Sequence, residues 1–140
     1  MWNRTAATVA EGDIVVFNLS MTGTETTNNL YGDTASGWAS VLQPTTATGW
    51  HGIHALVRTG GADDVRVKVM VRGRGLIRLD GTAITTSGER VGVQNASFIG
   101  SNPATGAKAL GITMAVPTSA ADTTVQCVFD GVYGFGTDAA

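Results

Sequence analysis

Positively charged side chains are the most chemically distinctive feature of this sequence, because most of them lie in one short stretch. Five of the nine Lys and Arg residues fall between positions 66 and 78 of a 140-residue chain whose net charge is −2. They are Arg66, Lys68, Arg72, Arg74 and Arg78. Clustered guanidinium groups favour carboxylate-rich protein surfaces, so this stretch is a candidate contact surface. A solvated face is the alternative interpretation.

Few residues suit catalysis or metal binding. His51 and His54 are the only histidines, and on a strand their spacing places them on opposite faces. Turn chemistry accounts for four of the aspartates, namely Asp63, Asp64, Asp80 and Asp130. The chain has neither a Walker-type GK[ST] motif nor a complete dinucleotide-binding glycine loop. We therefore predict no catalytic residue, no metal and no cofactor.

Nucleic-acid binding is a minor alternative, because residues 65–79 contain no aromatic side chain and the net charge is negative. The single Cys127 excludes an internal disulfide, and the alternation within residues 123–129 predicts a buried thiol. No apolar run approaches the roughly 18 residues of a membrane span, and no signal peptide is recognisable. We expect the chain to be made in a reducing cytoplasm and to have no membrane partner.

The cations must be positioned by a β-strand. Val65, Val67, Val69 and Val71 alternate with them, and this two-residue period is typical of a half-buried strand. Gly73 and Gly75 interrupt the alternation and predict a bulge or a bend.

Composition places this strand in an all-β domain. Charged residues make up only 14% of the chain and there are 19 glycines, which is typical of many short strands joined by turns. Residues 1–10 lack a sustained period and are predicted to form an N-terminal arm outside the core. Residues 11–140 are predicted to form a single β domain with a long polar loop inserted at 19–37.

The later half of the chain repeats the earlier half. Residues 12–18 align with 88–94 at an offset of 76, residues 44–57 with 103–116 at an offset of 59, and residues 65–73 with 123–131 at an offset of 58. We expect two copies of one β unit, about 11–79 and about 87–135, to close their edges in a small barrel or sandwich.

The cations do not take part in this repeat. Arg66, Lys68, Met70 and Arg72 align with residues that carry no positive charge, namely Thr124, Gln126, Val128 and Asp130. The fold therefore does not require a basic face at these positions, which leaves the cations available for a functional hypothesis.

Three segments carry a resemblance to a known family: GIHALVRTGGADDVRVKVMVRGRGLIRL at 52–79, GTAITTSGERVGVQN at 81–95 and GAKALGITMAVPTSAADTTVQCVFDGV at 106–132. A glycine-led strand, a small-residue turn with Asp and a valine-rich strand occur twice around a Gly-Glu/Asp-x-Val segment. In this pattern the chain resembles the capsid decoration proteins, or cement proteins, of tailed phages.

The resemblance implies a non-enzymatic homotrimer on the exterior of a phage head, where it bridges neighbouring major capsid proteins. Terminal arms often take part in such docking by strand addition, which adds Trp2, Asn3 and Arg4 to the five cations as predicted capsid-binding residues. The insertion at 19–37 departs from the family pattern, and no role is assigned to it.

A carbohydrate- or other ligand-binding β-sandwich module is the alternative from another class of protein. In that case Tyr31, Trp38 and Trp50 would form the platform on which sugar rings stack.

Overall fold

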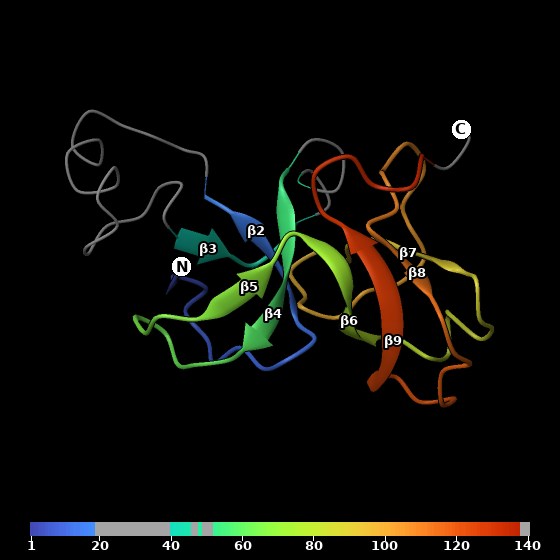
Figure 1. Cartoon of the computed structure of the whole chain (residues 1–140), viewed down its shortest axis with the longest axis horizontal. Helices are drawn as coiled ribbons and strands as arrows, with labels where there is room; N and C mark the ends of the chain where they lie inside the picture. The colour runs from blue at the N-terminus through green and yellow to red at the C-terminus, as the bar shows by residue number, and fades with distance from the viewer. Residues whose placement is uncertain (19–39, 46–47, 49–51, 138–140) are drawn as a thin grey trace.

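The computed structural model describes residues 1–18, 40–45, 48 and 52–137. The secondary structure elements of this part of the chain are nine β-strands in two sheets, which lie side by side along the long axis of the molecule (Figure 1). The predicted all-β fold is confirmed, and its two sheets form the predicted small barrel or sandwich. Among the described residues, no helix is long and apolar enough to cross a membrane.

The first sheet contains β1 (Trp2–Asn3), β2 (Ile14–Phe17), β3 (Ser40–Leu42), β4 (His54–Thr59) and β5 (Lys68–Met70), in the order β1-β3-β2-β4-β5. Its two edges meet. Trp2 forms an antiparallel bridge to Arg66, and the backbone N–H of Val67 donates to the Met1 carbonyl at 2.8 Å. The sheet therefore curls around its own apolar side chains.

The second sheet contains β6 (Arg72–Leu79), β7 (Arg90–Val91), β8 (Gly111–Thr113) and β9 (Thr123–Asp130), in the order β6-β9-β8-β7. A short segment at Gly100 and Ser101 lies between its edges. Ser101 bridges Gly92 in the antiparallel sense, and Gly100 bridges Leu79 in the parallel sense. This sheet too curls until its edges are joined.

The two units have one topology, which confirms the internal repeat. We call β1 to β5 the first unit, and β6 to β9 with residues 100–101 the second unit. In each unit the first and third segments pair in parallel and the other neighbours pair antiparallel. Two rows of cross-strand partners occupy equivalent positions: Ile14, Leu56 and Met70 in the first unit, and Arg90, Ile112 and Val128 in the second.

The hydrogen-bond ladders correct two details of the predicted repeat. The sequence alignment matches Val57 with Val116, whereas the ladders match Val57 with Thr113, three residues earlier. The first copy is predicted to extend to residue 79, but the chain leaves the first sheet after Met70 and enters the second at Arg72. The second unit thus begins at β6, earlier than the predicted boundary near residue 87.

The predicted bend near the glycine pair is confirmed and the predicted bulge is not. Gly73 has a φ of 131°, a backbone conformation that residues with a Cβ rarely adopt. From there to Leu79, β6 pairs with β9 without a break in register. A Cβ at Gly75 would lie 2.9 Å from the end of the Met70 side chain, so this glycine gives Met70 room between the two units.

Two apolar cores hold the units together. One fills the first sheet and contains Val9, Val15, Val41, Ala55, Val57 and Val67. The other fills the second sheet, and Ile14 and Leu56 of the first sheet enter it, with Met70 packed against it. Both faces of β2 and β4 are buried, which explains why their sequences contain continuous apolar runs instead of an alternating pattern.

The valine row is confirmed at three of its four positions. Val67 is buried, and Val69 and Val71 pack against the core of the first sheet. Val65 is 46% exposed, because it lies in the turn before β5. Cys127 is buried as predicted, and burial raises the pKa of its thiol to about 12, which leaves it protonated and unreactive at neutral pH.

The prediction of an N-terminal arm outside the core is wrong. Trp2 and Asn3 form β1, which pairs with β3 on one side and with the residues before β5 on the other. Val9 is 1% exposed and belongs to the first core. With only two residues, β1 is too short to show an alternating pattern in the sequence. Its backbone groups nevertheless complete the closure of the first sheet.

Candidate docking surface

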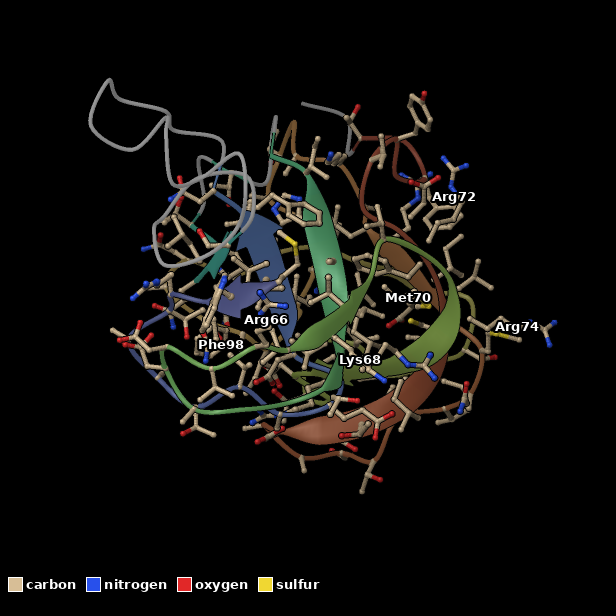
Figure 2. The ribbon with its side chains drawn as sticks, turned by 60° about the vertical axis from the view of Figure 1, so that its left-hand side comes forward. Arg66, Lys68, Met70, Arg72, Arg74 and Phe98 are labelled. Atoms are coloured by element: carbon tan, nitrogen blue, oxygen red, sulfur yellow. The ribbon has the colours of Figure 1, made fainter. Side chains whose placement is uncertain are left out.

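The eight predicted capsid-binding residues do not form one surface. Figure 2 shows Arg66 on the side of Phe98, whereas Arg72 and Arg74 lie on the opposite side of the molecule and Arg74 projects away from the ribbon. Their surroundings differ as well, since Arg4, Arg72 and Arg78 form ion pairs within the chain and Arg66 lies over an aromatic ring. The partners determine which side chains remain available to another molecule.

Asn3 is part of the fold. It is fully buried, and its Nδ2 donates to the carbonyls of Ala7, Gly61 and Ala62 at 2.8, 3.1 and 2.9 Å. Its backbone N–H donates to Val65, and its carbonyl accepts from Asp64. With both strand edges of β1 already paired, Asn3 cannot add to a strand of another protein in this conformation.

Arg4 and Arg66 have partners close to β1. Arg4 forms an ion pair with Asp64 in the turn before β5. The guanidinium of Arg66 lies over the ring of Trp2, 5.2 Å from its centroid. A cation in this position is held by the aromatic ring while its outer face stays open to solvent.

Arg78 links the two units. It forms an ion pair with Asp13, which precedes β2, and its Nη2 pairs with Asp122 of the second unit at 2.7 Å. Hydrogen bonding to Asp122 raises the pKa of Arg78, and the same contact lowers the pKa of Asp122. Burial raises the pKa of Asp13, whose side chain is 1% exposed, against the hydrogen bonds from Ala10 and Arg78. The charge of Arg78 is therefore neutralised within the fold.

Arg72 is also paired, although it remains accessible. Its Nε donates to Asp130 at 3.0 Å, and its guanidinium lies 5.3 Å from the ring centroid of Tyr133. Arg72 and Asp130 are also cross-strand partners in the β6–β9 ladder. The acidic residue that replaces Arg72 in the second copy is thus its direct neighbour in space.

Three exposed cations surround the junction of the two sheets, and they have neither a carboxylate nor an aromatic ring as a partner in the described part of the chain. Lys68 lies on β5, Arg74 on β6 and Arg58 on β4, where Thr59 pairs with Lys68. Arg58 Nη1 donates to the Arg74 carbonyl at 3.1 Å and lies 3.7 Å from Met70 Sδ. All three residues are exposed. We call Arg58, Lys68 and Arg74 the cationic seam.

Sequence reasoning missed Arg58, because it lies outside the stretch that gathers the other cations. The strand pattern could have identified it. Arg58 follows the apolar run of β4, and antiparallel pairing of β4 with β5 brings it beside Lys68. A search for cations on neighbouring strands would have found it.

Several predicted residues lie outside the described part of the chain. They include His51, the proposed sugar-stacking residues Tyr31, Trp38 and Trp50, and the insertion at 19–37. Within the described residues, no three His, Cys, Asp or Glu side chains are placed to hold a metal ion.

Lys108 is a structural residue that sequence patterns did not single out. Its Nζ donates to the carbonyls of Gly52, Gly131 and Val132 at 2.6, 3.3 and 3.0 Å. Burial lowers the pKa of Lys108, although the charge of Asp130 opposes this shift. The ammonium group therefore fastens the segment after β9 to the backbone before β4.

Replacing Lys108 with Met is expected to lower the free energy of unfolding by about 1–2 kcal/mol, because three carbonyls lose a charged donor while the alkyl stem is retained. Urea denaturation monitored by tryptophan fluorescence measures this. The control is Lys68→Met, which removes an exposed ammonium and should change stability by less than about 0.5 kcal/mol. Equal effects of the two substitutions would show that the three carbonyl contacts do not stabilise the fold.

Comparisons with protein-family models, with curated proteins and with solved structures each find no match. The chain is an all-β protein of two topologically equivalent units, with a cationic seam at their junction.

Proposed function

We propose that this chain is a non-enzymatic structural protein of a virion, which binds the outer surface of a phage head and cements neighbouring major capsid proteins. The observation that carries the proposal is the cationic seam. Its three cations come from three strands, whereas Arg4, Arg72 and Arg78 have acidic partners within the chain. A basic surface that the fold does not neutralise favours an acidic protein partner.

The scaffold suits such a role. The seam residues are carried by strands of two curled sheets with joined edges, so little backbone ordering is required when a partner binds. The resemblance of residues 52–79, 81–95 and 106–132 to capsid decoration proteins supports the choice of a phage head as the partner. A homotrimer is part of this proposal, because three linked contacts raise the effective concentration of each one.

Co-sedimentation with heads of the corresponding phage, assembled without this chain, tests the proposal. We expect saturable binding at low ionic strength, and weaker binding at about 0.5 M salt because seam contacts are screened. The proposal would be overturned if the purified chain stayed in the supernatant at both salt concentrations.

A further inference from the structure

Arg58 is the residue of the cationic seam whose side chain is fixed by contacts within the described part of the chain. Its Nη1 donates to the Arg74 carbonyl at 3.1 Å and lies 3.7 Å from Met70 Sδ. Because Arg58 lies on β4 and Arg74 on β6, the guanidinium reaches from the first sheet to the backbone of the second. The Arg74 side chain itself projects away from the ribbon (Figure 2). The cations of the seam are therefore not equivalent.

Gly75 provides the space in which this guanidinium lies. Gly75 is buried, and a Cβ at this position would lie 2.9 Å from Arg58 Nη1 and 2.9 Å from Met70 Cε. Both distances are shorter than real Cβ contacts, so a side chain at position 75 would displace the Arg58 guanidinium. A glycine that interrupts the alternation of residues 65–79 thus makes room for an arginine of the other sheet.

The fixed guanidinium of Arg58 keeps its carboxylate-binding edge open. A guanidinium carries two donors side by side along its Nε–Nη2 edge, and this edge matches a carboxylate in a bidentate pair. Both intramolecular contacts of Arg58 are made by Nη1, which lies outside that edge. The residue is exposed, so the Nε–Nη2 edge is accessible to another molecule. Because the side chain is already ordered, binding a carboxylate there costs little conformational entropy.

Lys68 adds a second positive charge beside this edge. It lies on β5, the strand that pairs with β4. Val67 is buried in the first core and Val69 packs against it, so Lys68 points to the opposite face. Met70, which Arg58 contacts, belongs to that face too, since it packs against the second core. A carboxylate bound to Arg58 would therefore lie on the same face as the Lys68 ammonium.

We infer that Arg58 recognises a single carboxylate of the partner protein in a bidentate pair, with Lys68 as a supporting charge. The major capsid protein as the owner of this carboxylate rests on the proposed function, whereas the carboxylate site itself rests on the contacts of Arg58. Geometry, and not net charge alone, then determines binding. A lysine at position 58 would keep the charge but would lack the edge with two parallel donors.

An NMR titration of the purified chain tests the site without phage heads. The probes are a capped Gly-Glu-Gly peptide, its Gly-Gln-Gly analogue and inorganic phosphate, and the signal observed is the Nε–H group of Arg58. We expect the Glu peptide to shift this signal more than the other two probes do, and the shift to become smaller in Gly75→Ala because the guanidinium is displaced. No shift with the Glu peptide, an equal or stronger response to either other probe, or an unchanged response in Gly75→Ala would overturn the inference.

Co-sedimentation with phage heads tests whether the same site contacts the capsid. Arg58→Lys and Gly75→Ala both keep the net charge, and we expect each to weaken binding about fivefold because the bidentate pair is lost or misplaced. Arg66→Lys and Gly111→Ala are the matched controls and should bind as the wild type does. Arg66 is an exposed arginine outside the seam, and Gly111 is a buried strand glycine where a Cβ would meet no atom closer than 3.4 Å.

The two assays separate the inference from the proposed function. If the wild type binds heads and Arg58→Lys binds them equally well, the bidentate contact with the capsid is overturned while the proposed function stands. If the wild type does not bind heads, the proposed function is overturned, and the titration of the Arg58 Nε–H signal decides the carboxylate site by itself.

Discussion

A variant in which Arg58, Lys68 and Arg74 are all replaced with Gln is expected to fold normally and to bind phage heads about tenfold to a hundredfold more weakly. Each exposed charge contact contributes a fraction of a kcal/mol up to about 1 kcal/mol, and three lost contacts add up to this range. The fold should tolerate the loss of charge on these strands, because the second unit has the neutral Gln126 where the first has Lys68. Circular dichroism checks the fold and co-sedimentation measures the binding.

The matched control removes the same charge from cations that have partners. Arg4, Arg66 and Arg72 contact Asp64, Trp2 and Asp130 respectively, and the triple Gln variant of these residues lowers the net charge equally. We expect this control to bind heads within about threefold of the wild type. If both variants lost binding alike, net charge alone would govern the interaction, and if neither did, the cationic seam would be a solvated surface.

The sequence was sufficient for the fold class and for the internal repeat, because both depend on local patterns. Gly12 and Gly88 illustrate this: the alignment matches them, and both adopt a positive φ at the start of equivalent strands. The point at which the chain leaves one sheet for the other was not predictable. Val71 continues the two-residue alternation, and only the fit of Met70 against Gly75 and the pairing of Arg72 with Asp130 show that the chain turns there.

The candidate site was predictable only in part, for a similar reason. Clustering in the sequence selected Lys68 and Arg74, which are in the seam, but also Arg78, whose acidic partners lie 65 and 44 residues away in the sequence. Asn3 was selected as a terminal contact residue, although the carbonyls that satisfy it come mainly from the turn after β4. Pairing between distant segments decides whether a polar side chain is free, and a single sequence does not reveal it.

Replacing Arg78 with Met is expected to lower the free energy of unfolding by about 2–3 kcal/mol. Removing one partner of a fully buried ion pair costs about 3–5 kcal/mol, because the other charge is left without compensation. The expected loss is smaller here because the side chain of Arg78 is 25% exposed. The affected charge is Asp13, which retains the N–H of Ala10 as a hydrogen-bond donor at 2.8 Å. Urea denaturation at neutral pH measures the loss. Asp122→Asn is the control, since it removes only the exposed half of the network and should cost less than about 1 kcal/mol.

A double-mutant cycle separates the buried charge from the packing of the Arg78 side chain. If the unpaired carboxylate of Asp13 causes the loss, Asp13→Asn in the Arg78→Met background should restore part of the stability, whereas additive effects would assign the loss to packing. The pH dependence gives a second criterion. Without Arg78, the already raised pKa of Asp13 rises further, so the folded state gains a proton as the pH falls. The loss of unfolding free energy in Arg78→Met, relative to the wild type, should therefore be largest above the pKa of Asp13 in the variant and should become smaller as the pH falls. A loss caused by packing would not change with pH.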